Sequence, residues 1–509
     1  MIPIIGIAIL SFYNLSTETS RSFFSFFKEE KNPLSLDNAL PIPINTSIIN
    51  KGYDLRVRQI TLFTSIIAFI FSTVIWSNFD YNLATFQFIS YWPTVAGLGG
   101  AKIGIDAFGL IFILLTTYLM PIAILSTWDN VQHGILSHLI SLLLIEALLI
   151  CVFISLDLIA FYVSFEAVLI PLYLLVGSHG ATDSRLKASM LLFLYTLGGS
   201  LCMLLGLIRL LELHGTSDIS ICALTQLDPE AQQWIWLSIF ISLSIKAPLV
   251  PVHIWLKTVH SEAPLSTSIL LAGLILKLST YGYIRLLLFL LPDATVYFSP
   301  LVLTLSAITV IHGALVTLRQ VDTKAFIAMS SISHMGIVML GLSSGTVHGI
   351  EGAMLMSVAH GLSSPALFII VGGVMYDRWH TRIIRYFKGL GSSMPSFKLW
   401  FFLATCASMG VPGSLNWISE LLCLGGAFEV SPGAAILGAT TIFLGAVYSI
   451  WLYMNITGGS LSPNLTLTPD LTRRERAMLM YLLWPIAFLG IFPSYLLTPL
   501  HFSVTNILL

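Results

Sequence analysis

The chain has 509 residues, of which 56% are hydrophobic and 10% charged, and its formal net charge is −1. Soluble domains carry roughly 25% charged residues, so this composition excludes a soluble protein and indicates an integral membrane protein. The near-neutral charge points to no nucleic-acid partner, and the five cysteines, which form no CxxC pair, predict neither disulfides nor a metal site.

The apolar stretches predict about fourteen membrane-spanning helices, because each span needs roughly 20 mostly apolar residues. These stretches are continuously apolar and lack the alternation of barrel strands, so an all-α membrane fold is expected. The first 13 residues lack the basic flank and cleavage site of a signal peptide and are expected to form a short helix. The expected spans are roughly 1–13, 60–77, 106–127, 138–155, 157–177, 188–210, 233–250, 266–290, 300–318, 325–342, 351–375, 399–427, 433–455 and 477–497.

Lys and Arg are distributed very unevenly between the loops. Nineteen of the 24 fall in the odd-numbered loops, whereas in the even-numbered loops only Lys102 is clear. The remaining four, Arg209, Lys246, Lys277 and Arg285, lie within or at the edge of spans. The positive-inside rule therefore places the odd-numbered loops on the inner side and both termini on the outer side. Segment 14–59, which is the first loop, is long and polar and is expected to be a surface loop.

Two apolar spans are interrupted by helix breakers in a similar way. Pro248 and Pro251 follow Lys246 in "SLSIKAPLVPVHIWL", and Pro412 precedes Glu420 in "ASMGVPGSLNWISELL". Pro248 and Pro412 are 164 residues apart, and Glu166 and His334 are 168 apart. Such near-equal offsets predict two inverted five-helix repeats, each with a broken helix, as in many transporters. A proline frees backbone groups, which are tolerated only beside a cavity or a protein partner.

The predicted order along the chain follows from these two patterns. A first helix at 1–13 is followed by the polar loop at 14–59 and by helices 2 and 3 with their loops at 60–137. The first repeat spans 138–290, the second repeat spans 300–455, and a last helix spans 477–497.

Seven ionisable side chains lie deep within these spans. A charge near the bilayer centre costs several kcal/mol, so it is usually paired, hydrated or functional. Residues three or four positions away are often hydroxyls or amides, so the charges lie on polar stripes that face the bundle interior. The candidates for a proton pathway are Glu146, Glu166, Lys246, Lys277, His334, His360 and Glu420.

The competing interpretation is that these groups make structural contacts between helices. For a single intramembrane serine, or for His312 alone, that interpretation is preferred. For seven groups in separate spans, a proton or ion pathway is the stronger prediction. Arg209, Glu212 and Glu429 lie near span ends and are expected at the membrane interface, whereas the position of Arg285 leaves both interpretations open.

Several of the same stretches resemble those of a known family. The sequences "FYVSFEAVLIPLYLLVG", "SIKAPLVPVHIWL", "HSEAPLSTSILLAGLILKLSTYG", "LRQVDTKAFIAMSSISHMGIVMLG", "AHGLSSPALFIIVGG" and "GVPGSLNWISELL" are similar to those of the antiporter-like subunits of respiratory complex I. The resemblance runs from about residue 100 to 497, in the expected order. Segment 14–59 lies outside it.

The resemblance implies a 14-helix subunit that moves protons and binds no redox cofactor. It implies that Glu166 and Lys246 form a charge pair in the first half-channel, that Lys277, His334 and His360 continue a central axis, and that Glu420 serves the second half-channel. Glu146 resembles a carboxylate near subunit contacts. Glu420 marks one branch of the family, because sister subunits carry lysine at the corresponding place.

The resemblance also implies a setting and partners. The chain is expected in the mitochondrial inner membrane beside chain 2 and chain 5 relatives, accessory subunits and phospholipid such as cardiolipin. NADH, FMN, iron–sulfur clusters and ubiquinone are expected on other subunits. In the expected mechanism, quinone reduction elsewhere perturbs the Glu166–Lys246 pair, and a proton passes along Lys277 and the histidines to Glu420.

One loop departs from the family pattern. In "LKTVHSEAPL", Lys257 replaces a usual proline and Leu265 a usual threonine, while His253, His260 and Glu262 are retained without an assigned step. The main alternative is a subunit of a stand-alone cation/proton antiporter. A redox enzyme with its own cofactor is disfavoured, because no GxGxxG follows a strand and no cysteine cluster is present. A pure scaffold would not need the buried charges.

Overall fold

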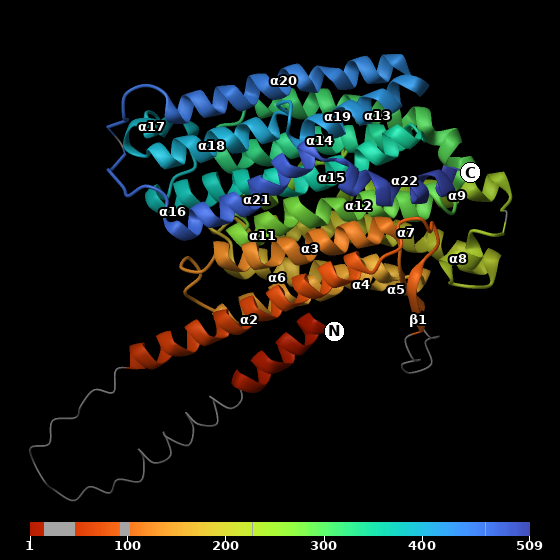
Figure 1. Cartoon of the computed structure of the whole chain (residues 1–509), viewed down its shortest axis with the longest axis horizontal. Helices are drawn as coiled ribbons and strands as arrows, with labels where there is room; N and C mark the ends of the chain where they lie inside the picture. Colours follow the sequence, from red (N-terminus) through yellow and green to blue (C-terminus); the bar gives the residue numbers. More distant parts are fainter. Residues whose placement is uncertain (15–45, 92–101, 226, 464, 509) are drawn as a thin grey trace, which may run out of the picture.

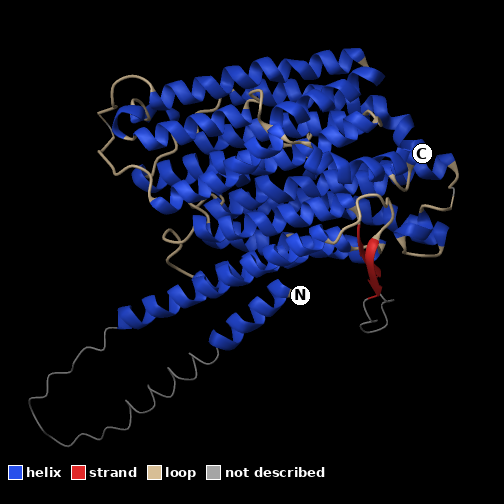
Figure 2. Ribbon diagram, viewed as in Figure 1, coloured by secondary structure: helices blue, strands red, loops and turns tan. Residues whose placement is uncertain are grey.

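The computed structural model describes residues 1–14, 46–91, 102–225, 227–463 and 465–508, and side chains within residues 46–51 are left aside. The helices run roughly side by side in one bundle (Figures 1 and 2). The short helix Ile2–Asn14 and α2 (Thr46–Ser77) lie at one edge of the bundle, and α20 (Pro432–Thr457) lies at the other. The expected helical membrane fold is therefore confirmed for these residues, apart from one small β-hairpin.

The helices of the first half are α3 (Ala107–Ser126), α4 (Ile135–Ile154), α5 (Leu158–Ala167), α6 (Leu169–His179), α7 (Arg185–His214), α8 (Ile219–Cys222), α9 (Pro229–Lys246), α10 (Ile254–Glu262), α11 (Leu265–Leu270) and α12 (Leu276–Gly282), with π-helical segments η1 (Leu271–Ile275) and η2 (Tyr283–Leu288). The second half contains α13 (Pro292–Thr317), α14 (Thr323–Ser343), α15 (Val347–Phe368), the π-helical segment η3 (Ile369–Met375), α16 (Tyr376–Trp379), the short 3-10 helix η4 (Ile384–Tyr386), α17 (Leu390–Ser393), α18 (Pro395–Ser408), α19 (Leu415–Val430), α21 (Arg473–Ile491) and α22 (Ser494–Leu508).

Ten helical stretches among the described residues are long and apolar enough to cross a membrane, and the pair α21 and α22, bent by 68°, would make an eleventh span. The other three predicted spans correspond to the short helix Ile2–Asn14, to α9, and to the interrupted pair α18 and α19. The count of fourteen therefore stays a prediction.

Segment 14–59 is only partly described. Residues 15–45 lie outside the described part, and α2 already begins at Thr46, so the described end of the segment belongs to a helix. A small antiparallel hairpin stands outside the expected spans. It joins β1 (Gln87–Tyr91) to β2 (Lys102–Ile105), with Gln87 opposite Ile105 and Tyr91 opposite Lys102.

Short polar side chains mark where several helices begin. Asp157 accepts hydrogen bonds from the amides of Ile159 and Ala160 at the start of α5. Asp322 does the same for Lys324 and Ala325 at the start of α14. Because the first amides of a helix have no partner within it, these caps fix the helix ends and the side chains that follow them.

Both predicted helix breaks are present. The helix α9 ends at Lys246, and helical structure resumes at α10 beyond Pro248 and Pro251. The second break separates α18 from α19, and Gly410 and Gly413 there have φ of +70° and +93°. These positive φ values favour glycine, because other L-residues are strained in this conformation.

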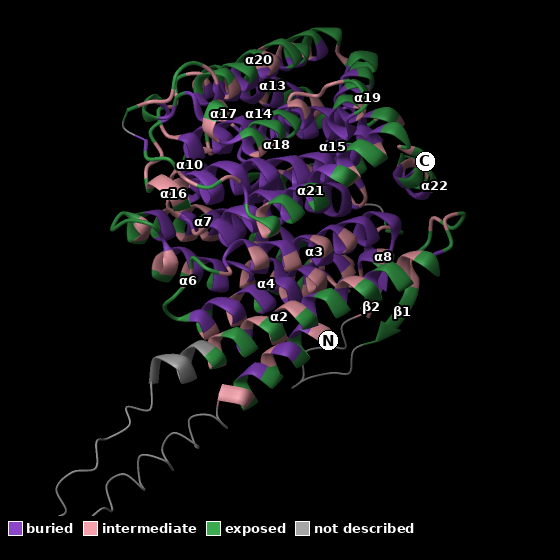
Figure 3. Cartoon of the chain, turned by 60° about the vertical axis from the view of Figure 1, so that its left-hand side comes forward, coloured by how far each residue is buried: buried purple, intermediate pink, exposed green. Residues whose placement is uncertain are grey.

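The most buried helices lie at the centre of the bundle. The stretch from α11 to η2, the helix α14, and most of the stretch from α15 to η3 are enclosed by protein, whereas α2 and α20 expose much of their apolar surface. Figure 3 shows the same contrast between a buried interior and exposed outer helices. Polar groups within the central helices are therefore held away from lipid.

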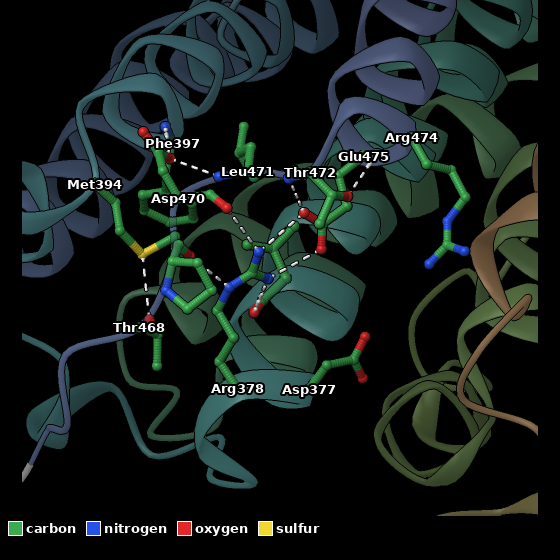
Figure 4. A network of polar contacts seen from close by, with 12 residues as sticks. Asp377, Arg378, Met394, Phe397, Thr468, Asp470, Leu471, Thr472, Arg474 and Glu475 are labelled. Carbon is green, nitrogen blue, oxygen red and sulfur yellow. Dashed lines mark hydrogen bonds and ion pairs between the residues drawn. The ribbon is translucent and has the colours of Figure 1, made fainter.

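A polar network fixes the loops at one end of the bundle (Figure 4). The guanidinium of Arg378 donates to both carboxylate oxygens of Glu475, at 3.0 and 2.9 Å, which links α16 to α21. Asp470 accepts hydrogen bonds from the amides of Ser396 and Phe397 at the start of α18. The bidentate pair and the cap hold α18, which leads into the second break.

Candidate functional site

The seven predicted ionisable residues come from six helices and the end of a seventh. Glu146 lies in α4, Glu166 in α5, Lys277 in α12, His334 in α14, His360 in α15 and Glu420 in α19, while Lys246 is the last residue of α9. Four of them form one connected chain of contacts. These four are Lys277, His360, His334 and Glu420.

The first contact of this chain joins Lys277 to His360. The Lys277 Nζ atom lies 2.7 Å from His360 Nδ1 and also donates to the Ala272 carbonyl at 2.5 Å. Ala272 belongs to the π-helical segment η1, whose hydrogen-bond pattern departs from that of a regular α-helix. The lysine is therefore held by the irregular part of its own helix and aimed at α15.

Two glycines allow this close approach. Cβ atoms built at Gly273 and Gly361 would lie 3.4 Å and 3.1 Å from the carbonyl oxygen of the other glycine. At Gly273 the same Cβ would also lie 2.6 Å from a methyl carbon of Leu119. The backbones of η1 and α15 therefore meet where no side chain stands between them, close to the Lys277–His360 contact.

The chain continues through a second histidine to a carboxylate. The rings of His360 and His334 lie 5.6 Å apart between centroids, and His334 Nδ1 lies 3.6 Å from Glu420 Oε1. The Tyr448 hydroxyl lies 3.5 Å from His334 Nε2. A small cavity of about 10 Å³, lined by Ser330, His334, Tyr448 and other residues, adjoins this place. That volume is close to what one water molecule requires.

The second helix break positions Glu420. A Cβ atom on Gly410 would lie 3.0 Å from Glu420 Oε2, so the carboxylate occupies space that any other residue at 410 would restrict. Asn416, one turn before Glu420, donates to the Ala407 carbonyl at 2.7 Å and so bridges the break. Ser414 caps α19 by accepting from the Trp417 amide. Break, cap and carboxylate thus form one unit.

The predicted pair at the first break is not in direct contact. The Lys246 Nζ atom donates to the Phe165 carbonyl at 3.1 Å and lies 3.0 Å from the centroid of the Phe165 ring, a cation–π contact. Among the described residues, no carboxylate lies within 4.0 Å of it, and both Glu166 oxygens are buried without a protein hydrogen-bond partner. Glu166 still acts electrostatically on Lys246.

Glu146 lies apart from the other six. It is fully buried in α4, and neither carboxylate oxygen has a hydrogen-bond partner among the described residues. Among the described residues, the charged group that acts on it is the N-terminal amine of Met1. The structure therefore does not join Glu146 to the connected chain.

Two buried groups near the site had no role assigned from the sequence. The His260 ring stacks on the Phe368 ring, with 4.9 Å between the centroids. The positive charges of Lys324 and Lys277 act electrostatically on it. The buried Lys324 donates to the Ala263 carbonyl at 2.9 Å. Lys324 lies near a helix start, where a lysine is ordinarily a surface residue. The retained "HSEAP" stretch was the one sequence signal for His260.

A buried ion pair outside the chain was also not predicted. Arg285 in η2 lies 2.7 Å from Asp106, which caps α3, and both side chains are buried. This pair answers the question that the sequence left open for Arg285, because it joins two helices rather than facing the membrane interface. Among the described residues, no group of three or more His, Cys, Asp and Glu side chains has an arrangement that could hold a metal ion.

Comparisons with known proteins identify the family. Residues 155–445 match the family model described as "NADH:quinone oxidoreductase/Mrp antiporter, TM". The chain is 49% identical over 453 residues to the NADH-ubiquinone oxidoreductase chain 4 of Mycosarcoma maydis, covering 89% of this chain and 93% of that protein. It is 42% identical to the chain 4 protein of Arabidopsis thaliana, covering 89% and 91% of the two. The chain belongs to the NADH-ubiquinone oxidoreductase chain 4 family.

Solved structures share the fold. A chain of respiratory complex I from Thermus thermophilus superposes with a TM-score of 0.82 at 27% identity, covering 91% of this chain and 98% of that one. A chain of the Mrp complex from Dietzia superposes with a TM-score of 0.78, covering 91% and 94%, but at 17% identity it shows only the fold. The resemblance to the antiporter-like subunits of respiratory complex I is therefore confirmed, and the stand-alone antiporter has less support.

Proposed function

We propose that this chain translocates protons across the mitochondrial inner membrane as a core membrane-arm subunit of respiratory complex I. In this proposal, NADH oxidation and ubiquinone reduction take place on other subunits, which hold FMN, the iron–sulfur clusters and the quinone. This chain contributes no redox step of its own. Its part in the enzyme is to couple a change of charge to proton movement.

The observation that carries the proposal is the connected chain from Lys277 to Glu420. Four ionisable groups from four separate helices are buried in the centre of the bundle, where a charge is costly unless it has a function or a partner. Each group can take up and release a proton. A merely structural set would pair opposite charges, as Arg285 and Asp106 do.

The proposed proton transfer uses the atoms that face one another. The Lys277 ammonium donates its proton to His360 Nδ1, and the ring then releases the proton on its Nε2 side, which has no protein partner. A bridging water or a rotation of the ring carries the proton across to His334, because the rings are too far apart for a direct hydrogen bond. His334 then protonates Glu420, which releases the proton outward.

The Glu166–Lys246 site is proposed to control this transfer. Two unit charges at about 6 Å and an effective dielectric constant of ~20 attract by roughly 3 kcal/mol, so a change in their separation strongly affects the proton affinity of both groups. Lys246 now contacts Phe165, the residue next to Glu166. A small movement of α5 would therefore replace the Phe165 carbonyl by the Glu166 carboxylate as the partner of Lys246.

The proposed setting extends the expectations from the sequence. The chain would lie beside chain 2 and chain 5 relatives, accessory subunits and phospholipid such as cardiolipin, with both termini on the intermembrane-space side. The excess of Lys and Arg in the odd-numbered loops supports that orientation. Glu146, which lies outside the connected chain, would serve as a relay to a neighbouring subunit. The two inverted five-helix units at 138–290 and 300–455 are part of the same proposal.

Two measurements test the proposed function in sequence. In a native gel of mildly solubilised membranes, the chain should migrate with a very large band that oxidises NADH. A small assembly without that activity would instead favour the stand-alone antiporter. In the assembled complex reconstituted into vesicles, Glu420→Gln should lower the number of protons pumped per NADH oxidised. An unchanged ratio would reject the pathway through Glu420.

A further inference from the structure

Two histidines face each other at one end of the bundle, outside the connected chain. His138 lies in the first turn of α4, and His179 is the last residue of α6. Their rings meet edge to face, with 4.8 Å between the centroids. Both helix ends adjoin odd-numbered loops, for which the excess of Lys and Arg predicts the inner side of the membrane. On this orientation, the pair lies between the inner aqueous side and the buried centre.

The two rings differ in their exposure. His179 is half-buried, and its Nδ1 atom lies 2.7 Å from the hydroxyl of the exposed Ser178. His138 is only 1% exposed, and its Nε2 atom lies 3.1 Å from the hydroxyl of the fully buried Ser266 at the start of α11. The four polar groups therefore lead from the surface into the interior.

Neither ring is held in an ion pair. The Nδ1 atom of His138 is buried without a hydrogen-bond partner among the described residues. Within the same part of the chain, no carboxylate lies within 4.0 Å of His138 or His179, whereas His501 lies 2.8 Å from Glu351. The charged groups that act on the two rings are Arg58 of α2 and Arg185 of α7. A proton on either ring therefore has no carboxylate to hold it in place.

The neighbouring loops fix the position of His179. Gly134 has a φ of +62°, and a Cβ atom there would lie 3.3 Å from His179 Nε2. The loop after α6 is tied to the end of α10, because the Ala181 amide donates to the Glu262 carbonyl at 2.9 Å and the Thr182 hydroxyl donates to the Glu262 carboxylate at 2.6 Å. The histidine pair is therefore part of the fold.

Unpartnered polar groups continue inward from Ser266. The hydroxyls of Thr267 and Ser268, in the same turn of α11, and both ring nitrogens of His260 are buried without a protein hydrogen-bond partner in the described structure. Buried polar groups of this kind usually bind internal water. The charge of Lys277, where the connected chain begins, acts on His260. Polar groups thus extend from Ser266 toward Lys277.

We propose that His179 and His138 take up protons from the inner side and deliver them through Ser266 to the connected chain at Lys277. This inference rests on the proposed function and adds an entrance to its pathway. A proton received on His138 Nδ1 is balanced by the release of the Nε2 proton to the Ser266 oxygen, and Ser266 passes its own hydroxyl proton inward. Rotation of the His138 ring then restores its first tautomer. A bridging water carries the proton between the two rings.

A purely structural role for His138 would be to tie α4 to α11 through its hydrogen bond to Ser266. The substitution His138→Gln separates the two roles, because an amide can keep this hydrogen bond but takes up no proton near neutral pH. In vesicles that contain the intact complex, it should cause at least about half the loss of pumping caused by Glu420→Gln, since a positioned proton carrier typically contributes 10²–10⁴-fold to its transfer step. Pumping is measured as the membrane potential formed per NADH oxidised.

A second variant allows chemical rescue. His179 is half-buried beside the exposed Ser178, so His179→Ala leaves a space that free imidazole can enter from the aqueous side. The variant should lose pumping, and added imidazole should restore at least about half of the loss, because imidazole can carry the proton in place of the side chain. Pyrazole has a similar shape but is not protonated near neutral pH, so it should restore nothing. The membrane potential suits this test, because imidazole dissipates a pH gradient directly.

The matched control is a third histidine on the same side of the bundle. His133 is exposed in the loop before α4, and His133→Gln should leave pumping unchanged. Native gels establish that each variant assembles, and the half-buried His179 keeps the test valid if His138→Gln does not assemble.

The outcomes separate this inference from the proposed function. Normal pumping by His138→Gln while Glu420→Gln is impaired would reject the entrance and leave the pathway to Glu420 in place. Normal pumping by both variants would reject the entrance and the pathway together. Equal rescue of His179→Ala by imidazole and pyrazole would show that the histidine only fills space. An equal loss in His133→Gln would show that the effect is not specific to the pair.

Discussion

The two helix breaks place their charged residues in different surroundings. At the second break, Glu420 lies 3.6 Å from His334 and is connected through His360 to Lys277. At the first break, Lys246 contacts only the carbonyl and ring of Phe165 among the groups described, while the Glu166 oxygens have no protein partner. The same sequence pattern, a charged residue near a proline, therefore gives a connected site at the second break and a separated pair at the first.

Local backbone geometry explains this difference. Gly410 has a positive φ and no Cβ, so the Glu420 carboxylate can lie directly against the break. At the first break, the lysine ends its helix and reaches across to α5, where the backbone of Phe165 offers the nearest oxygen. We interpret the connected chain from Lys277 to Glu420 as a preformed pathway and the first break as the place where a change of charge alters contacts.

The largest effect is expected at Lys277, where the connected chain begins. Lys277→Met removes the proton donor to His360 while keeping a side chain of similar length. Because a positioned proton donor typically contributes 10²–10⁴-fold to the rate of proton transfer, we expect proton pumping to fall at least about tenfold. The measurement is the number of protons moved per NADH oxidised in vesicles that contain the complex.

A neighbouring residue provides the control for Lys277. Ser279 is also buried in α12, but its hydroxyl donates only to the Leu276 carbonyl of its own helix. Ser279→Ala should therefore leave pumping nearly unchanged. Pumping by Lys277→Met at the normal ratio would contradict the idea of a preformed pathway along the connected chain.

A smaller effect is expected at the separated pair. Glu166→Gln breaks no hydrogen bond of the described structure, so the complex should assemble normally. Only the charge interaction with Lys246 is lost, and beyond 4 Å this is worth less than about 4 kcal/mol at an effective dielectric constant of 20. We expect a severalfold loss of pumping, smaller than that of Lys277→Met. A loss of pumping larger than that of Lys277→Met would place the critical step at the Glu166–Lys246 pair.

Substitution of the two glycines at the second break distinguishes the effect of backbone strain from the effect of moving the Glu420 carboxylate. Gly410→Ala and Gly413→Ala each force alanine into positive φ, at a cost of roughly 1–2 kcal/mol. Only the Cβ at residue 410 would press on Glu420, since nothing lies within 4 Å of a Cβ at residue 413. Both variants should lose some thermal stability, but Gly410→Ala should lose more pumping. Equal pumping by the two variants would show that the function of Glu420 does not depend on its contact with Gly410.

The contacts of the connected chain could largely be anticipated from the sequence. Lys277, His334, His360 and Glu420 each lie deep in an apolar span with hydroxyls or amides three or four residues away. Such polar stripes must face the bundle interior, and this orientation brings the four groups toward one another. The two breaks were also predictable, because proline and glycine act locally on the backbone.

The remaining features depend on tertiary geometry that the sequence pattern does not contain. The Asp106–Arg285 pair joins residues 179 positions apart, and Asp106 alone indicates only a helix cap. The π-helical segment η1, in which the Ala272 carbonyl accepts a hydrogen bond from Lys277, cannot be predicted from the hydrophobic pattern. The separation of Glu166 from Lys246 depends on how α5 and α9 pack, which spacing along the chain does not fix.

The smallest effect is expected at an ion pair that supports only the first half. Lys102 Nζ lies 2.9 Å from Asp218, and the Asp218 backbone forms a bridge to Asp157, which caps the helix of Glu166. Partial burial opposes ionisation of Asp218, but hydrogen bonds from Lys102 and Ser220 outweigh it and lower the pKa of the carboxyl. The stabilisation is therefore present above the ordinary aspartate pKa of about 3.9 and is lost as the pH falls through the lowered value.

Asp218→Asn should remove this pH-dependent contribution, which for an ion pair near the surface is about 0.2–1 kcal/mol. Hydrogen exchange in the first turn of α5, corrected for intrinsic rates, should rise up to about fivefold at neutral pH, and the difference from the unsubstituted protein should shrink in acid. The control is Glu212→Gln, which breaks the exposed pair with Arg209 on α7 and should leave α5 unchanged. Equal exchange at neutral pH would show that the start of α5 is held by its cap alone, and pumping should then be insensitive to this substitution.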